Sequence, residues 1–318
     1  MTGLGYAYGD ACLVPLISSL LAPLVVGVDV RETGRAWSAM IAAIRNLGRP
    51  GLCSMAIAAV DIALWDLKAR CLGQPLHRLL GAGRDAVPVY GSGGFTNYTM
   101  EQLIGQLAGW VNDGIPRVKL KIGRLPWRDE LERVVAVRTA LGDNVELYVD
   151  ANGAYDRTTA RTVGSALATE AGVTWFEEPV SSDDLAGLAA LSTLLPLDVT
   201  AGEYGYHLPY FQEMLPAVDV LQADAGRCAG ITEWLRVAAA AEASQVPFSA
   251  HCGQSLHAHV ATVPPGLRHI EYFHDHARIE KLLFDNVLKP VNGCLRPTGT
   301  PGNGLTFKEA DAAEFRVR

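Results

Sequence analysis

The chain has 318 residues, of which 49% are hydrophobic and 19% are charged. This composition is typical of a globular protein with a large buried core, arranged as two domains or as one long α/β barrel. The formal net charge is −7 and Lys and Arg do not cluster in the sequence, so nucleic acid is excluded as an expected partner.

The sequence shows no sign of export or of membrane insertion. Its first residues lack the basic start and apolar core of a secretion signal. The longest apolar stretch, from Leu52 to Leu67, is interrupted by Asp61 and Asp66 and is too short to span a bilayer. Six cysteines are scattered without CxxC pairs, as expected for free thiols in a reducing compartment. We therefore expect a cytoplasmic protein without a membrane partner.

Residues 1–86 are predicted to be mainly helical. Asp10 is placed to cap a first helix, whose leucines recur at helical spacing and which Pro23 is expected to end. A second helix is predicted over 36–46 and a third over 54–70. Because the third is apolar nearly all round, we expect it to be buried.

From Val87 onward, short apolar runs alternate with amphipathic stretches. The eight predicted strands begin near Val87, Arg117, Val145, Thr174, Leu197, Asp219, Pro247 and Arg268. Seven helices are predicted between them, over 100–111, 128–141, 157–168, 184–195, 209–215, 232–243 and 256–263. This alternation is typical of a parallel barrel. A doubly wound sheet would carry a GxGxxG turn after its first strand, and residues 91–94 do not match that spacing.

Seven successive predicted strands carry an ionisable residue at or near the C-terminal end. In chain order these are Lys119 with Lys121, Asp150, Glu177 with Glu178, Glu203, Asp224, His251 and Glu271. The C-terminal ends of barrel strands carry the active site, because the βα loops converge there. Ordinary surface charges would be scattered between the helices and both strand ends, so the regularity favours a functional site.

Three of these residues, Asp150, Glu177 and Glu203, end adjacent strands, which lie ~4.8 Å apart in a sheet. Carboxylates that close repel one another unless a cation lies among them. Oxygen ligands without Cys or His favour Mg²⁺ over Zn²⁺, so a magnesium site is predicted. The alternative is that each carboxylate pairs separately with a lysine or an arginine. Side chains alternate along a strand, so only one of Glu177 and Glu178 is expected to face the metal, and the residues alone leave the choice open.

Candidate proton-transfer groups lie on other strands. Lys119 and Lys121 share one face of their strand. Near a divalent cation, like-charge repulsion and partial burial are expected to depress both pKa values toward those of useful bases. Asp224 and His251 end a further pair of adjacent strands, where the carboxylate would fix the imidazole tautomer. Cys252 follows His251, but neighbours on a strand point to opposite faces, so we interpret Cys252 as structural.

Together these motifs resemble the enolase superfamily, specifically its mandelate racemase subgroup. The resemblance rests on Lys119-Leu120-Lys121, Asp150-Ala151-Asn152, Glu177-Glu178-Pro179, Gly202-Glu203, Asp224 and His251, in that order. It implies a modified TIM barrel, (β/α)7β, over 87–290, and a partial, mainly helical N-terminal α+β capping domain over 1–86. A C-terminal segment, 291–318, would return to the capping domain. The start of that domain, as the family has it, is expected to be missing.

The resemblance also implies roles for the residues that bind the metal and the substrate. Mg²⁺ would be held by Asp150, Glu177 and Glu203, which makes Glu177 the inward glutamate. Glu271 matches a position that hydrogen-bonds a substrate carboxylate oxygen, and Asn152 matches a polar group that lines the site.

The implied acid and base groups lie on opposite faces of the substrate. Lys121 matches the base on one face, with Lys119 as its neighbour near the carboxylate, and His251 with Asp224 matches the acid/base on the other. The implied reaction is Mg²⁺-dependent removal of the proton α to a carboxylate, through a stabilised enediolate.

We expect this reaction to dehydrate a sugar acid, aldonic or aldaric, to a 2-keto-3-deoxy acid. Racemisation or epimerisation of a 2-hydroxy acid would use the same residues. A metal-dependent hydrolase barrel would need an HxH pair after its first strand, and residues 87–94 contain no histidine. A truncated, weak or silent barrel with a binding or structural role is the alternative of another class. The expected partner is a small-molecule carboxylate, and the resemblance implies a homo-oligomer.

Overall fold

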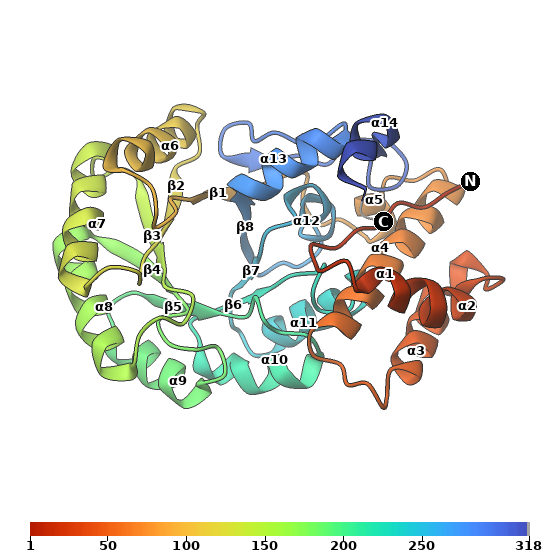
Figure 1. Cartoon of the computed structure of the whole chain (residues 1–318), viewed down its shortest axis with the longest axis horizontal. Helices are drawn as coiled ribbons and strands as arrows, with labels where there is room; N and C mark the ends of the chain where they lie inside the picture. The colour runs from red at the N-terminus through yellow and green to blue at the C-terminus, as the bar shows by residue number, and fades with distance from the viewer. Residues whose placement is uncertain (317–318) are drawn as a thin grey trace.

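The computed structural model describes residues 1–316, and its largest feature is a closed ring of eight parallel strands (Figure 1). The strands are β1 (Val87–Gly93), β2 (Arg117–Lys121), β3 (Glu146–Asp150), β4 (Val173–Glu177), β5 (Asp198–Ala201), β6 (Val220–Ala223), β7 (Phe248–Ala250) and β8 (Leu267–Phe273). Strand β1 pairs with both β2 and β8, which closes the ring.

Seven α-helices alternate with these strands around the outside of the ring (Figure 1). They are α6 (Met100–Asn112), α7 (Trp127–Leu141), α8 (Arg157–Ala171), α9 (Leu185–Leu194), α10 (Leu208–Met214), α11 (Ile231–Ala243) and α12 (Gln254–Val260). Helix α13 (His274–Leu283) follows the last strand. The predicted (β/α)7β barrel is therefore confirmed.

Local sequence signals set several of the helix boundaries. Thr99 caps α6 by accepting the N–H of Gln102, whose side chain in turn accepts the N–H of Thr99. Asp156 caps α8, and Gly172 ends this helix with a left-handed φ of 59°. These capping interactions fix where the two helices begin and where α8 ends.

An aromatic layer fills the inside of the barrel. Tyr90, Tyr148 and Trp175 are fully buried in a cluster separate from the larger core between strands and helices. The rings of Tyr148 and Trp175 stack with centroids 5.2 Å apart. Because side chains two residues apart share a face of a strand, Asp150 lies one step beyond Tyr148 and Glu177 one step beyond Trp175. The aromatic layer is thus the floor beneath these carboxylates.

The N-terminal residues form a group of helices beside the barrel (Figure 1). After η2 (Val30–Glu32) come α3 (Thr33–Ala43), α4 (Leu52–Cys71) and α5 (Leu76–Leu79). As predicted, α4 is largely buried, with Ala56, Ile57 and Ala58 fully inaccessible.

The prediction that Pro23 ends the first helix is wrong. Helical structure runs from α1 (Leu13–Leu16) through a π-helical turn (Ile17–Leu21) into α2 (Ala22–Val25), which contains Pro23 at its start. Proline lacks an N–H group and its ring collides with the carbonyl one turn earlier in a regular α-helix. The wider π turn just before Pro23 relieves that conflict, so the helix continues.

Asp61 of α4 connects the N-terminal helices to the barrel. It is fully buried, and Thr232 of α11 donates its N–H to Oδ2 (3.0 Å) and its hydroxyl to Oδ1 (2.7 Å). Gly230 has a φ of 99°, and a Cβ atom there would lie 2.3 Å from Asp61 Oδ2, so this close approach requires glycine. Burial is the main cause that raises the pKa of Asp61 to about 7.

We expect Asp61→Asn to flatten the dependence of stability on pH. The folded-state pKa of Asp61, about 7, lies above the unfolded value of ~3.9. The stability that the fold has with Asp61 protonated is therefore full below the unfolded pKa and is lost as pH rises through the folded pKa. The slope is at most ~1.4 kcal/mol per pH unit, and asparagine has no proton to lose. Urea denaturation at about pH 5 and about pH 7 measures the change in the free energy of unfolding between the two pH values. The exposed Asp85→Asn variant is the control, and equal slopes for all three proteins would contradict the prediction.

The C-terminal residues contact both the barrel and the N-terminal helices. Strand β10 (Cys294–Leu295) pairs antiparallel with β1, and β11 (Thr306–Phe307) pairs with β9 (Phe284–Asp285) before the short helix α14 (Glu309–Ala312). On α4, Asp66 accepts the N–H of Asn303 (2.6 Å), and Arg70 donates to the carbonyl of Leu305 (3.0 Å).

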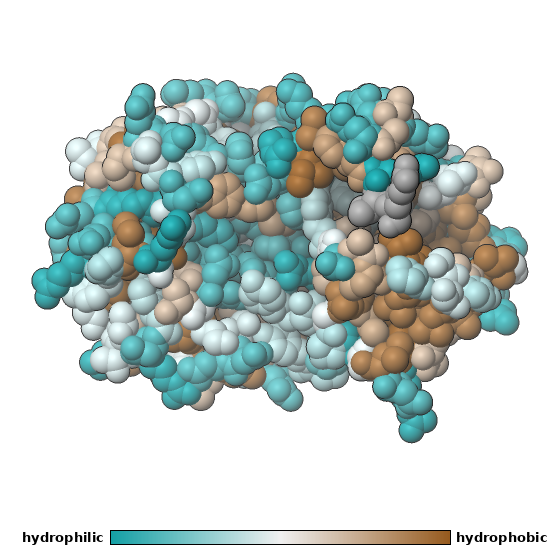
Figure 2. Space-filling view, in the orientation of Figure 1, coloured by the Kyte–Doolittle hydropathy of each residue, from teal (hydrophilic) through white to brown (hydrophobic). Residues whose placement is uncertain are grey.

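The surface differs between the two parts of the molecule. Figure 2 shows hydrophilic residues gathered over the barrel and a hydrophobic area over the N-terminal helices, where Val14 and Val26 are exposed. Within residues 1–316, every helix falls short of the length or the hydropathy that crossing a bilayer requires.

Candidate active site

The strand register brings the predicted site residues to one end of the barrel. Lys121 pairs with Asp150, and Asp150 pairs with Glu177, across the parallel strands β2, β3 and β4. Glu203 follows the end of β5, and His251 follows the end of β7 directly. All of these side chains therefore emerge at the C-terminal mouth of the barrel.

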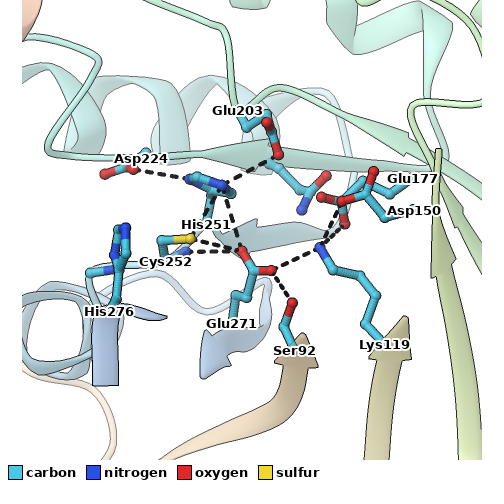
Figure 3. A network of polar contacts seen from close by, with 12 residues as sticks. Ser92, Lys119, Asp150, Glu177, Glu203, Asp224, His251, Cys252, Glu271 and His276 are labelled. Atoms are coloured by element: carbon cyan, nitrogen blue, oxygen red, sulfur yellow. Dashed lines mark hydrogen bonds and ion pairs between the residues drawn. The ribbon is translucent and has the colours of Figure 1, made fainter. Parts of the chain in front are cut away.

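The carboxylates of Asp150, Glu177 and Glu203 converge on one point (Figure 3). One oxygen atom from each lies within 4.8 Å of those of the other two, and none of the three residues is more than 4% exposed. Glu177 Oε1 is buried without a hydrogen-bond partner among the residues that the structure describes. Burial, followed by the charge of Asp150, raises the pKa of Glu177. Negative charge at this point is therefore not fully compensated by the protein.

Glu178 lies near the same site but is not one of the three carboxylates that share a point, in agreement with the expectation that only one of the two glutamates faces the metal. Strand β4 ends at Glu177, and Glu178 has a left-handed φ of 41°, which breaks the alternation of side chains. Glu178 is 1% exposed, and burial together with the charge of Glu203 raises its pKa. A further carboxylate thus adds to the negative potential at the mouth.

Lys119 lies among the acids, as Figure 3 shows. Its Nζ atom is 2.6 Å from Glu177 Oε2, 2.9 Å from Glu271 Oε1 and 3.4 Å from Asp150 Oδ2, and the residue is 1% exposed. Lys121 forms an ion pair with Asp150 and is more accessible. One lysine is thus enclosed by carboxylates, whereas the other faces the opening.

Without a bound cation, the pKa values of both lysines are raised, so the depressed values expected near a divalent cation stay a prediction. Burial disfavours both charged ammonium groups, but the neighbouring carboxylates outweigh it. Glu177 and Glu271 raise the pKa of Lys119 well above its usual value, and Asp150 raises that of Lys121. For Lys121, the repulsion from Lys119 is a smaller effect than the attraction to Asp150.

His251 and Asp224 form a hydrogen-bonded pair on the other side of the mouth (Figure 3). His251 Nδ1 is 3.0 Å from Asp224 Oδ2, and Nε2 is 3.3 Å from Glu203 Oε2. Burial opposes the charged imidazole, but Cys252, Glu203 and Asp224 outweigh it and raise the pKa of His251. Burial also opposes the charge on Asp224, but the hydrogen bond from His251 lowers the pKa of Asp224 to about 2. The carboxylate therefore fixes which ring nitrogen faces the site.

Two residues at the site were not predicted. The Ser92 hydroxyl of β1 donates to Glu271 Oε1. Cys252, interpreted from the sequence as structural, has its Sγ atom 3.3 Å from both His251 Nε2 and Glu271 Oε2. The cause is the left-handed φ of 48° at Cys252, just beyond the end of β7, which breaks the alternation of side chains.

Asn152, predicted to line the site, lies at its outer edge. Its N–H donates to Asp150 Oδ1 (2.8 Å), and the exposed residue borders a surface hollow of about 440 Å³ that Lys121 also lines. The structure therefore places Asn152 beside the opening and not among the buried acids.

Comparisons with known proteins identify the family. Residues 102–311 match the enolase C-terminal domain-like family, and residues 2–81 match the mandelate racemase / muconate lactonizing enzyme N-terminal domain. The L-talarate/galactarate dehydratase of Salmonella typhimurium is 32% identical over 295 residues, which cover 91% of this chain and 72% of the relative.

Solved structures give the same result. A mandelate racemase/muconate lactonizing enzyme-like protein from Rubrobacter xylanophilus is 50% identical with a TM-score of 0.96, over 98% of this chain and 88% of that one. The L-talarate dehydratase from Polaromonas sp. JS666, solved with Mg and L-glucarate, is 33% identical with a TM-score of 0.88, over 98% of this chain and 87% of that one. The chain belongs to the enolase superfamily, in its mandelate racemase subgroup. It is an enzyme of the lyase or racemase type.

Proposed function

We propose that this enzyme removes the proton α to the carboxylate of a sugar acid in a Mg²⁺-dependent reaction, and that it dehydrates the acid to a 2-keto-3-deoxy acid. One observation carries the proposal. The buried carboxylates of Asp150, Glu177 and Glu203 share a point, with Lys121 beside Asp150 and His251 beside Glu203.

The residues at the mouth fit a magnesium ion. Asp150, Glu177 and Glu203 would hold it, since carboxylate oxygens are the ligands that Mg²⁺ prefers and the ligand atoms already lie within 4.8 Å of one another. Within the described part of the chain, Glu177 Oε1 has no partner, so it is free to bind a cation. When bound, the ion would offset the clustered negative charge and stabilise charge that develops on a substrate carboxylate.

Lys119 and Glu271 face the place where that charge would develop. The buried ammonium group of Lys119 would stabilise the second negative charge of the enediolate, in a site of low dielectric where such contacts are strong. Glu271 holds Lys119 in place at 2.9 Å, and Ser92 donates to the same oxygen. Burial opposes the charge on Glu271, but Lys119 and His251 outweigh it and hold its pKa well below the usual value, so the ionised side chain would act by positioning Lys119.

Lys121 and His251 would carry the protons. One of the two takes the α-proton as a general base. The other, which lies at the opposite end of the row of carboxylates formed by Asp150, Glu177 and Glu203, is then available as a general acid. In a dehydration, His251 gives a proton to the β-hydroxyl as its C–O bond breaks, and water leaves. The resulting enol tautomerises to the keto acid. Asp224 would support this role by holding the imidazole through Nδ1.

The substrate class is inferred from the relatives together with the polar mouth. The Salmonella typhimurium relative is a talarate/galactarate dehydratase, and the Polaromonas relative was solved with L-glucarate. Racemisation or epimerisation of a 2-hydroxy acid is the second candidate. The observation that favours it is that a basic group lies at each end of the carboxylate row, so that a proton removed from one face could be returned to the other.

The test is a panel of aldonic and aldaric acids assayed with Mg²⁺ in deuterated water. Formation of a keto acid with loss of water is expected. Deuterium at the α-carbon of two epimers without loss of water would instead favour the racemase. The absence of both turnover and exchange with every acid of the panel would contradict the proposal. The control is the same assay without Mg²⁺.

A further inference from the structure

A second cluster of metal-ligating atoms lies on the side of Glu271 that faces away from Lys119 (Figure 3). Its members, His251 Nε2, Cys252 Sγ and Glu271 Oε2, all lie within 4.8 Å of one another, and no residue of the three is more than 8% exposed. We propose that these side chains form a binding site for Zn²⁺, separate from the magnesium site, and that zinc bound there blocks the enzyme.

The distances within the cluster match a tetrahedral zinc site. Cys252 Sγ is 3.3 Å from His251 Nε2 and 3.3 Å from Glu271 Oε2, and the last two atoms are 3.6 Å apart. A zinc ion with a Zn–S bond of ~2.3 Å and Zn–N and Zn–O bonds of ~2.0–2.1 Å separates its ligand atoms by ~3.3–3.6 Å. Zinc therefore fits between these atoms with little movement, and its fourth position is left for water.

Each of the three ligands is already oriented by a neighbour. His251 Nδ1 bonds to Asp224 Oδ2 at 3.0 Å, so that Nε2 is the ring nitrogen on the side of the cluster, as in carboxylate–histidine–zinc sites. Ser92 and Lys119 hold Glu271 through Oε1, so that Oε2 faces the cluster and keeps a lone pair for the metal beside the bond from the Cys252 N–H. The N–H of Cys252 donates to that Oε2 atom (3.2 Å) and fixes the two ligands relative to each other.

The chemistry of the ligands separates this site from the magnesium site. A thiolate and an imidazole select zinc, whereas the oxygen ligands of Asp150, Glu177 and Glu203 select Mg²⁺. On binding, the Zn–S bond replaces the proton of the Cys252 thiol, and any proton on His251 Nε2 leaves as well, both to water. The thiolate and the Glu271 carboxylate then balance the two positive charges of the ion.

Inhibition follows from the identity of one ligand. A zinc ion on Nε2 uses the lone pair with which His251 would accept or return a proton, so the enzyme with zinc bound cannot complete the reaction. This step rests on the proposed function, but zinc binding itself does not. We therefore expect free Zn²⁺ to inhibit reversibly even at saturating Mg²⁺, and a chelator to restore activity.

The test uses Co²⁺ as a spectroscopic replacement for zinc. Added to the Mg²⁺-loaded protein, Co²⁺ should give a near-ultraviolet thiolate-to-cobalt band with tetrahedral visible bands, and one equivalent of Zn²⁺ should remove them. Cobalt at the all-oxygen site gives no thiolate band. Cys252→Ser should lose the band, and Cys71→Ser, which alters an exposed thiol, should keep it. No band in the parent, or an unchanged band in Cys252→Ser, would overturn the proposal.

Further measurements separate this proposal from the proposed function and from misfolding. Cys252→Ala is a second variant, and thermal unfolding of both Cys252 variants shows whether they are folded. If the enzyme turns over a sugar acid, Zn²⁺ inhibition should weaken at least tenfold in a folded Cys252 variant, and equal inhibition would count against the site. A cobalt band without any turnover would leave the zinc site standing and remove the proposed function alone.

Discussion

Lys121→Ala and His251→Asn should each lower the rate of sugar-acid turnover by about 10²- to 10⁴-fold, the usual contribution of a positioned general acid or base. The reason is that these two side chains lie beside opposite ends of the carboxylate row, so neither replaces the other. Steady-state turnover with Mg²⁺ measures the loss. The exposed Lys289→Ala variant is the control and should keep the parent rate.

Solvent exchange in the same variants separates the base from the acid. The variant that lacks the base should neither turn over substrate nor exchange the α-proton with deuterium. The variant that lacks only the acid should form little product but should still exchange that proton, because the base removes the α-proton before the acid protonates the leaving hydroxyl. Parent-like turnover in both variants would show that the assigned roles are wrong.

Glu177→Gln should nearly abolish turnover, by about 10³-fold, and yet stabilise the protein without metal. Burial and the charge of Asp150 raise the pKa of Glu177, so ionisation of this side chain costs the folded state free energy as pH rises through that pKa. An amide has no such cost. We expect a gain of roughly 1–3 kcal/mol in the free energy of unfolding at about pH 9.

Magnesium should reverse this order of stability. Saturating Mg²⁺ stabilises the parent by about 3 kcal/mol at a hundredfold excess over Kd, whereas the variant has lost a ligand and should gain much less. Thermal unfolding in chelator and in Mg²⁺ measures both effects. The exposed Glu170→Gln variant should follow the parent in each condition. A Glu177→Gln protein that is less stable than the parent without metal would contradict the electrostatic argument.

The position of the site could be predicted from the sequence because barrel geometry is regular. Parallel strands put their C-terminal ends on one side, so charges that recur at those ends have to meet. In the structure, Lys121 pairs with Asp150 and Asp150 pairs with Glu177, so the charged residues that end neighbouring strands in the sequence lie side by side. The eight strands and seven helices could be read in the same way, from alternation and helical spacing.

What the pattern missed lies just beyond the strand ends. Asn152, Glu178 and Cys252 all have left-handed φ angles there, and each follows a barrel strand by one or two residues. The rule of alternating faces holds only while the backbone is extended, so it failed for Cys252. A sequence signal existed at two of the three positions, since Gly153 and Gly253 follow directly and glycine marks turns.

The lysine pKa values could not be predicted from the sequence for a different reason. A pKa shift is the sum of opposing effects that depend on distances, and the sequence showed only that Lys119 and Lys121 share a face. The structure adds that Glu177 Oε2 is 2.6 Å from Lys119 Nζ, and attraction at that distance exceeds repulsion between the amines. A cation among the carboxylates would weaken this attraction and move both lysine pKa values back down.

The most direct measurement for the whole account is calorimetric titration of the metal-free enzyme with Mg²⁺, in two buffers that differ in ionisation enthalpy. We expect one ion to bind per chain, protons to be released at neutral pH because the pKa of Glu177 is raised, and Glu177→Gln to bind little Mg²⁺. Equal binding by the parent and by that variant, without proton release, would mean that these carboxylates do not hold a metal.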